Sequence, residues 1–235
     1  LPKKKINLPA VNGPASNVDK TKVFLVDIPK AAQSQFRVGY ATGLKYDATG
    51  DFYKSRLMNH GLGGDFNSRL NLNLREDKGW TYGARSSFTA DEYTGDFEFS
   101  SGIRADATDS ALVEVMKEIR NYRENGITEP ELTFMKNSLG QRDALLYETG
   151  IQKAGFIGRI LDYNLPANYI DQQNKILANL TKKQVDEVAK KYLNPDKMNI
   201  LLVGDKAKIM EGIKKLGYEV VELDADGKPI EKKGF

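Results

Sequence analysis

The sequence contains no cysteine and a single histidine, His60. The absence of cysteine excludes disulfides and thiolate metal sites, and one imidazole cannot provide the two histidines that zinc peptidases commonly use. No nucleophilic Cys–His or Ser–His–Asp site can be argued either. No apolar run approaches the roughly 18 residues of a membrane span. The composition is that of a soluble globular protein, and the localisation stays unknown because cysteine-free chains occur in every redox compartment.

The 235 residues carry 35 basic and 32 acidic side chains, a net charge of +3. The two signs are mixed along the chain, so short lysine clusters indicate solvated surface and do not favour nucleic acid as a partner. Residues 1–20 are rich in proline, lysine and asparagine, which predicts a linker or extension. Residues 21–235 show no internal linker or repeat and predict a single domain.

The first half of the chain predicts strands and short helices in alternation. Thr21–Pro29 and Ser34–Leu44 are apolar enough for strands, and the turn between them predicts a hairpin that opens the domain. Asp51 is expected to cap the helix that follows. The elements expected after the hairpin are a helix from Asp51 to about His60, a helix over 68–76, and two antiparallel strands over 81–90 and 95–105.

The second half predicts mostly helices. Apolar residues between 112 and 122 form an i, i+3, i+4 stripe, while Thr128 with Glu131 and Thr181 with Gln184 match the capping-box pattern that begins a helix. The expected helices are 109–125, 128 to about 147, 152–163, 166–178, 181–193 and 207–216, with strands at 198–204 and, on the sheet edge, 218–223. This order predicts an α+β fold in which helices pack on one face of a mixed, mainly antiparallel sheet.

Two motifs near residue 60 have alternative interpretations. His60 could be a hydrogen-bonding residue at a helix end, or part of a remnant metal site with Asp51 and Asp65. We prefer the first interpretation because a catalytic zinc site needs three protein ligands, and we expect no metal on this chain. The glycines of 61–64 could form a phosphate loop, but the Lys-Ser/Thr pair is absent, which favours a helix–turn–helix corner.

Arg75 and Tyr82 are the best candidates for a binding site. Gly79 lies between them, so the arginine ends a helix, the tyrosine starts a strand, and both can meet at one corner. A guanidinium and a phenol donate hydrogen bonds that suit a peptide carbonyl or a forming oxyanion. Judged alone, the pair fits a structural role better, with the arginine bound to a carboxylate and the tyrosine at a strand end.

Motifs in a fixed order extend this picture beyond the pair. They are the Gly-Gly-x-Phe-x-Ser-Arg-Leu run at 63–70, the Leu-Arg-Glu-x-x-Gly run at 74–79 with Tyr82, and Leu-Leu-Val-Gly-Asp at 201–205. In this order the chain resembles one domain of the M16 (pitrilysin/insulinase-like) zinc peptidases. It departs from that pattern at Trp80 and Thr81, and above all in lacking the inverted His-x-x-Glu-His zinc helix.

The resemblance implies the non-catalytic half of such a peptidase. A homologous zinc-bearing domain, in the same polypeptide or in another chain, would be its partner, and the two would enclose and hydrolyse a peptide substrate. Arg75 and Tyr82 would then bind substrate, Gly63, Gly64 and Phe66 would help to shape the chamber, and zinc would be held by the partner domain. This chain alone would not be catalytic. The alternatives are an inactive M16-like scaffolding domain and a peptide-binding module that uses a sheet edge.

Overall fold

A computed structural model describes residues 18–142 and 148–230. Its six strands form one mixed sheet in the order β3-β4-β2-β5-β1-β6, with three antiparallel and two parallel pairs. The strands are β1 Lys22–Asp27, β2 Gln33–Ala41, β3 Ala84–Ala90, β4 Gly95–Arg104, β5 Asn199–Gly204 and β6 Glu219–Leu223. Residues 1–17 of the predicted linker, and 143–147 at the predicted end of one helix, lie outside the described residues.

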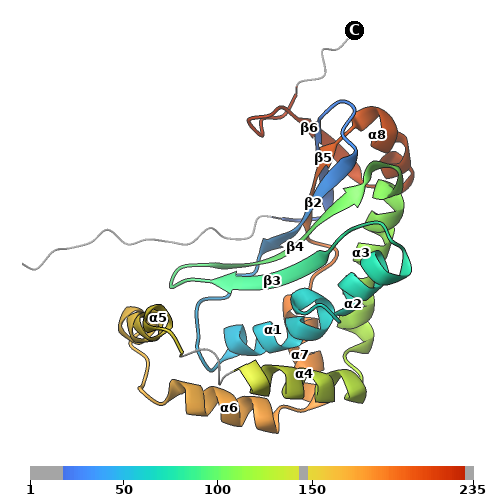
Figure 1. The fold of residues 1–235 in the computed structure, drawn as a ribbon. Coiled ribbons are helices and arrows are strands. Elements are labelled where there is room, and N and C mark those ends of the chain that lie inside the picture. The colour runs from blue at the N-terminus through green and yellow to red at the C-terminus, as the bar shows by residue number, and fades with distance from the viewer. Residues whose placement is uncertain (1–17, 143–147, 231–235) are drawn as a thin grey trace, which may run out of the picture.

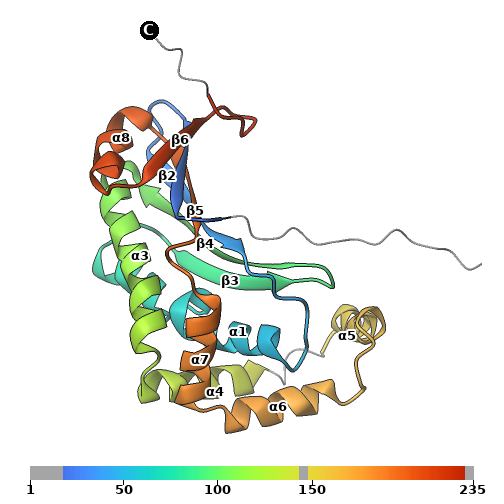
Figure 2. The same cartoon turned by 180° about the vertical axis from the view of Figure 1, so that it is seen from behind.

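The helices gather on one face of this sheet, as Figures 1 and 2 show from opposite sides. They are α1 Asp51–Asn59, α2 Arg69–Asn71, α3 Thr108–Asn125, α4 Glu129–Arg142, α5 Gly150–Asp162, α6 Tyr169–Asn179, α7 Lys182–Tyr192 and α8 Lys206–Lys215. The predicted α+β class, with helices on one face of a mainly antiparallel sheet, is confirmed. Among the described residues, none of the helices combines the length and apolar character that crossing a bilayer requires.

The core lies between the sheet and these helices. Along β4, Phe97, Phe99, Ser101 and Ile103 are buried while the residues that alternate with them are more exposed, as expected for a strand with one covered face. The predicted apolar stripe of α3 supplies the opposing surface, and all five of its members are buried: Leu112, Val115, Met116, Ile119 and Tyr122. Alternation in the strands and helical periodicity in α3 therefore meet in one core.

The predicted opening hairpin is wrong, because β1 and β2 are not hydrogen-bonded to each other. β5 lies between them, parallel to β1 with Lys22 opposite Asn199, and antiparallel to β2 with Val38 opposite Ile200. The connection at 28–32 has only to cross two strand spacings, about 10 Å, which five residues can span. Local turn signals give the strand directions but cannot reveal that a strand from the far end of the chain lies between the two.

The predicted capping boxes are confirmed. Thr128 and Thr181 each exchange hydrogen bonds with the residue three positions later. Asp51, however, is the first residue of α1 and not its cap, because the N-cap is Gly50, which has no side chain to form a capping hydrogen bond. Asp51 accepts from Lys191 Nζ at 2.7 Å and from the Tyr192 hydroxyl at 2.6 Å. These two bonds hold the pKa of Asp51 below its usual value, so the residue fastens α1 to the end of α7.

Candidate functional site

Two wide helical turns form the corner that carries the predicted site residues. α1 continues into the π-helical turn η1, His60–Gly64, and α2 continues into a second one, η2, Leu72–Asp77. The two predicted helices therefore exist, but each ends in a widened turn, a feature often found at functional sites. Gly79, with φ +62°, then reverses the chain after η2, as its position in the sequence predicts.

Arg75 lies inside η2 with its side chain 33% exposed. Its guanidinium carbon is 4.4 Å from the centre of the Phe66 ring. Nη1 is 3.0 Å from Glu76 Oε1, yet this buried nitrogen forms no well-directed hydrogen bond with any described residue. The guanidinium is thus held by a ring on one face and by a carboxylate at its buried Nη1 corner. The donors that could serve a ligand are those of the exposed part of the side chain.

Tyr82 projects from the loop between η2 and β3 and is 92% exposed. The loop is fixed to η2 by the backbone N–H of Trp80, which donates to Leu74 O at 3.0 Å. Thr81 Oγ1 accepts from the Gly83 N–H at 3.1 Å and tightens the turn. Tyr82 therefore lies two residues before β3 and does not start the strand. It belongs to the same helix-to-strand corner as Arg75, which lies in η2 on the other side of the reversal.

Asn71, which sequence reasoning missed, connects the two loops of this corner. Its buried side chain donates from Nδ2 to Phe66 O at 2.7 Å and accepts at Oδ1 from the Ala84 N–H at 3.0 Å. One amide thereby fixes the backbone beside the Phe66 ring and the end of the Tyr82 loop. The sequence feature that could have revealed this link is an asparagine within the apolar run of α2 and η2, because a buried amide needs hydrogen-bond partners.

Arg69, six residues before Arg75, has a different environment. Its Nε and Nη2 donate to the two oxygens of Glu131 at 2.6 and 2.7 Å, and Nη2 also donates to Gly126 O at 2.9 Å. Its guanidinium carbon lies 4.8 Å from the centre of the Tyr122 ring. Arg69 thus satisfies most of its donors within the fold and fastens α2 to α4, which is a structural role.

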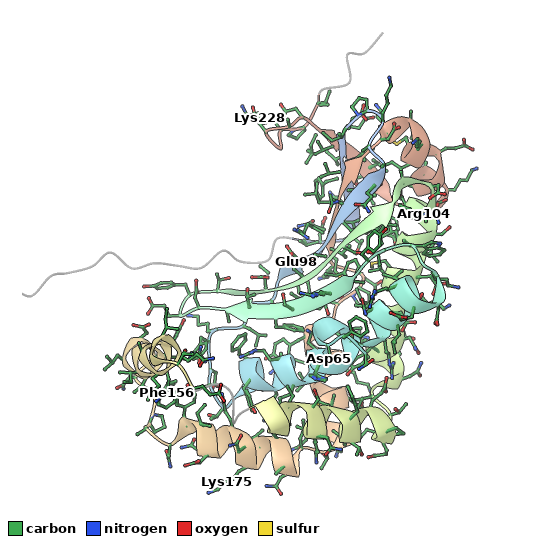
Figure 3. The ribbon with its side chains drawn as sticks, in the orientation of Figure 1. Asp65, Glu98, Arg104, Phe156, Lys175 and Lys228 are labelled. Atoms are coloured by element: carbon green, nitrogen blue, oxygen red, sulfur yellow. The ribbon has the colours of Figure 1, made fainter. Side chains whose placement is uncertain are left out.

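The three residues expected to shape a chamber lie in different environments. Gly63 is buried against β3, where it contacts Ser86, whereas Gly64 and Phe66 are exposed. Phe66 is 58% exposed despite its size. Asp65, labelled in Figure 3, begins the turn that carries this ring, and its carboxylate accepts from the Asn67 N–H at 3.0 Å. Phe66 is therefore the surface residue of the three that adjoins Arg75.

Replacing Gly63 by alanine is expected to destabilise the fold. The new Cβ would stand 2.2 Å from Ser86 Oγ and 2.7 Å from Ser86 N, and Ser86 is held in place by two hydrogen bonds with Asn59. Overpacking of this kind typically costs about 1–3 kcal/mol. Urea unfolding measures the loss. Gly140→Ala is the control, because no described atom outside the neighbouring residues and the α4 backbone lies within 4 Å of its Cβ position. This change should be neutral or stabilising. Equal stability of the two variants would contradict the packing argument.

His60 is buried at the start of η1, where its Nε2 lies 3.5 Å from Asp65 Oδ2 and its ring centre 5.9 Å from that of Phe134. Asp51 is at the opposite end of α1, bound to Lys191. The described residues contain no cluster of three or more side chains suited to a metal ion. One imidazole and one carboxylate do not make a catalytic zinc site.

The chain is similar to known proteins over most of its length. Residues 1–139 match the family model described as the peptidase M16 inactive domain. A crystal structure of a peptidase M16 inactive domain from Pseudomonas fluorescens is 30% identical, with a TM-score of 0.75 over 84% of this chain and 46% of that one. A protease from Helicobacter pylori shares the fold at 20% identity, with a TM-score of 0.70 over 87% of this chain and 48% of the other.

A curated relative from Helicobacter pylori is named "Non-peptidase homolog YmxG". It is 24% identical over 164 residues, 69% of this chain and 38% of that protein. The chain therefore spans less than half of the length of each of these three relatives. The family match covers more than half of the present chain and includes the corner with Arg75 and Tyr82. On this evidence, the chain belongs to the family of peptidase M16 inactive domains.

Proposed function

We propose that this chain is the substrate-binding, non-catalytic half of an M16-like zinc metallopeptidase. A homologous zinc-bearing domain, in the same polypeptide or in a separate chain, would complete the enzyme and supply the hydrolytic chemistry. The two halves would enclose a peptide between them. Support for a larger assembly comes from the relatives from Pseudomonas fluorescens and Helicobacter pylori, which are more than twice as long as the segment that matches this chain.

The contrast between Arg75 and Arg69 is the observation that carries this proposal. Arg69 begins the short helix α2 and Arg75 lies in the turn η2 that continues it. Arg69 uses its donors on Glu131 and Gly126, whereas Arg75 meets, among the described residues, a ring face and the corner of one carboxylate. A folded domain gains little from an arginine whose donors remain unused. Such donors suit the carbonyl oxygen of an extended peptide, which accepts but does not donate.

Tyr82 would act beside Arg75 at the same corner. Its exposure of 92% leaves the phenol free of the core, while the bonds of Trp80 and Ala84 fix the ends of its loop. A phenol on an anchored loop can reach into the space between two domains with little loss of order. In that place it would donate to the carbonyl oxygen as negative charge develops there, and so stabilise the transition state.

The alternative is an M16-like scaffolding domain without a proteolytic role. It is favoured by the name of the curated relative from Helicobacter pylori, which describes a non-peptidase homologue. A scaffold has no use for a stacked guanidinium with unused donors or for an exposed tyrosine on an anchored loop. The two proposals therefore differ in what they expect from replacement of Arg75.

Arg75→Ala in the assembled enzyme is expected to raise KM by about tenfold to a hundredfold, because a hydrogen bond to a charged group is worth about 1.5–3 kcal/mol. The measurement is steady-state cleavage of a fluorescence-quenched peptide that the wild-type assembly hydrolyses. Arg120→Ala is the control, since Arg120, on α3, forms an exposed ion pair with Asp196. An unchanged KM in the Arg75 variant would remove Arg75 as a substrate-binding residue, whereas an assembly that cleaves no peptide would favour the scaffold.

A further inference from the structure

Phe66 is a large apolar side chain that is not needed to fill the core. It is 58% exposed and lies in the surface turn between η1 and α2. The ring contacts Arg75, whose guanidinium carbon is 4.4 Å from the ring centre. This is well inside the roughly 6 Å range over which an aromatic face attracts a cation.

The backbone that carries the exposed ring is fixed by hydrogen bonds. Asn71 donates to the Phe66 carbonyl at 2.7 Å, and the turn is closed on either side because Asn67 N–H donates to Asp65 Oδ1 and Ser68 N–H donates to Asp65 O. A ring on a fixed backbone has few positions open to it. It can therefore determine the plane of a long side chain that packs on it, and arginine stacks on aromatic rings through its planar guanidinium.

Glu76 fixes how the guanidinium of Arg75 is turned within the plane that the ring sets. Its Oε1 lies 3.0 Å from Arg75 Nη1, so one corner of the guanidinium faces a carboxylate while one face is covered by the ring. Because Nη1 is buried while the side chain is 33% exposed, a ligand oxygen can approach the guanidinium from the side away from Glu76. Glu76 also offsets the positive charge of Arg75, which disfavours a strongly anionic group and suits a neutral carbonyl oxygen.

We propose that Phe66 is a positioning residue for Arg75, and that the stacked pair with Glu76 binds a backbone carbonyl within a peptide and not a free terminal carboxylate. This inference rests on the proposed function. It adds that the guanidinium is oriented before substrate arrives, which lowers the ordering cost of binding.

The test uses the assembled enzyme and quenched peptides that the wild type cleaves. Phe66→Leu should raise KM by about 3- to 30-fold with kcat nearly unchanged, the range of a cation–π contact. Phe66→Trp should retain the wild-type KM because it keeps an aromatic face. In an Arg75→Ala background, Phe66→Leu should have no further effect on KM.

A second test changes the peptide. Amidating the C-terminus of the peptide should leave the wild-type KM unchanged. Tyr93→Leu, an exposed aromatic at the other end of β3, is the control.

Each part of the proposal can be overturned separately. An unchanged KM in Phe66→Leu, beside a raised KM in Arg75→Ala, would remove the positioning role but leave the proposed function intact. A raised KM in Phe66→Trp equal to that of Phe66→Leu would also remove it, because loss of the aromatic face could not be the cause. A large KM increase on amidation would overturn the carbonyl assignment. An unchanged KM in Arg75→Ala would overturn this inference together with the proposed role of Arg75.

Discussion

Tyr82→Phe is expected to lower peptide cleavage by the assembled enzyme by about a hundredfold or more, the loss seen when one oxyanion donor is removed. The change deletes a single hydroxyl from a side chain that is 92% exposed, so neither packing nor stability should be affected. Because the phenol would act mainly on the developing oxyanion, kcat should fall together with kcat/KM. Steady-state kinetics on a quenched peptide measures both.

Tyr93→Phe is the matched control for this experiment. Tyr93 is also an exposed tyrosine, but it lies in the turn after β3, whereas Tyr82 precedes that strand. Its replacement should leave turnover unchanged. Wild-type turnover in Tyr82→Phe would remove the assigned role, even if Arg75 proved to bind substrate.

Arg69→Met should destabilise the protein by about 2–3 kcal/mol, somewhat less than the 3–5 kcal/mol typical of breaking a fully buried pair. The Arg69 and Glu131 side chains are 17% and 30% exposed, so water can partly solvate the Glu131 carboxylate that is left without its partner. The loss also removes the bond to Gly126 and the stacking on Tyr122. Urea unfolding at neutral pH measures the change in the free energy of unfolding.

The double variant Arg69→Met/Glu131→Leu is the control, because removing both charges should recover much of the lost stability.

The stability of the pair should also depend on pH. Burial would raise the pKa of Glu131, but the hydrogen bonds from Arg69 and Thr128 outweigh this effect and keep the pKa below its usual value. A lowered folded-state pKa gives stability that is present above the unfolded value, about 4.3, and is lost as the pH falls through the folded value. The difference in the free energy of unfolding between wild type and Arg69→Met should therefore become smaller below about pH 4. A difference that stayed constant through this range would argue against the ion pair as the cause.

Local patterns predicted the elements of the fold but not their full arrangement. The stripe on α3 and the alternation on β4 are properties of neighbouring residues, and both were confirmed. The opening hairpin failed because the position of β5 between β1 and β2 depends on a pairing such as Lys22 with Asn199. Neither strand carries that information alone, since a strand that can pair with one neighbour can also pair with another.

The corner of the candidate site was predicted in part for similar reasons. Gly79 marked the end of the second helix, which placed Arg75 and Tyr82 on either side of one reversal. The widening of that helix into η2 was not predicted, because apolar spacing near four residues does not distinguish a π-helical turn from an α-helix. The link through Asn71 depends on two loops meeting in space, and so does the stacking of Arg75 on Phe66.

The composition of the native assembly tests the central claim most directly. The polypeptide that carries this sequence should be purified from its source under mild conditions, and its intact mass, co-purifying chains and zinc content measured. We expect stoichiometric zinc and an inverted His-x-x-Glu-His motif, either in a longer form of the same polypeptide or in a tightly bound partner. A metal-free assembly in which no chain carries that motif would contradict the proposal and establish a non-peptidase role.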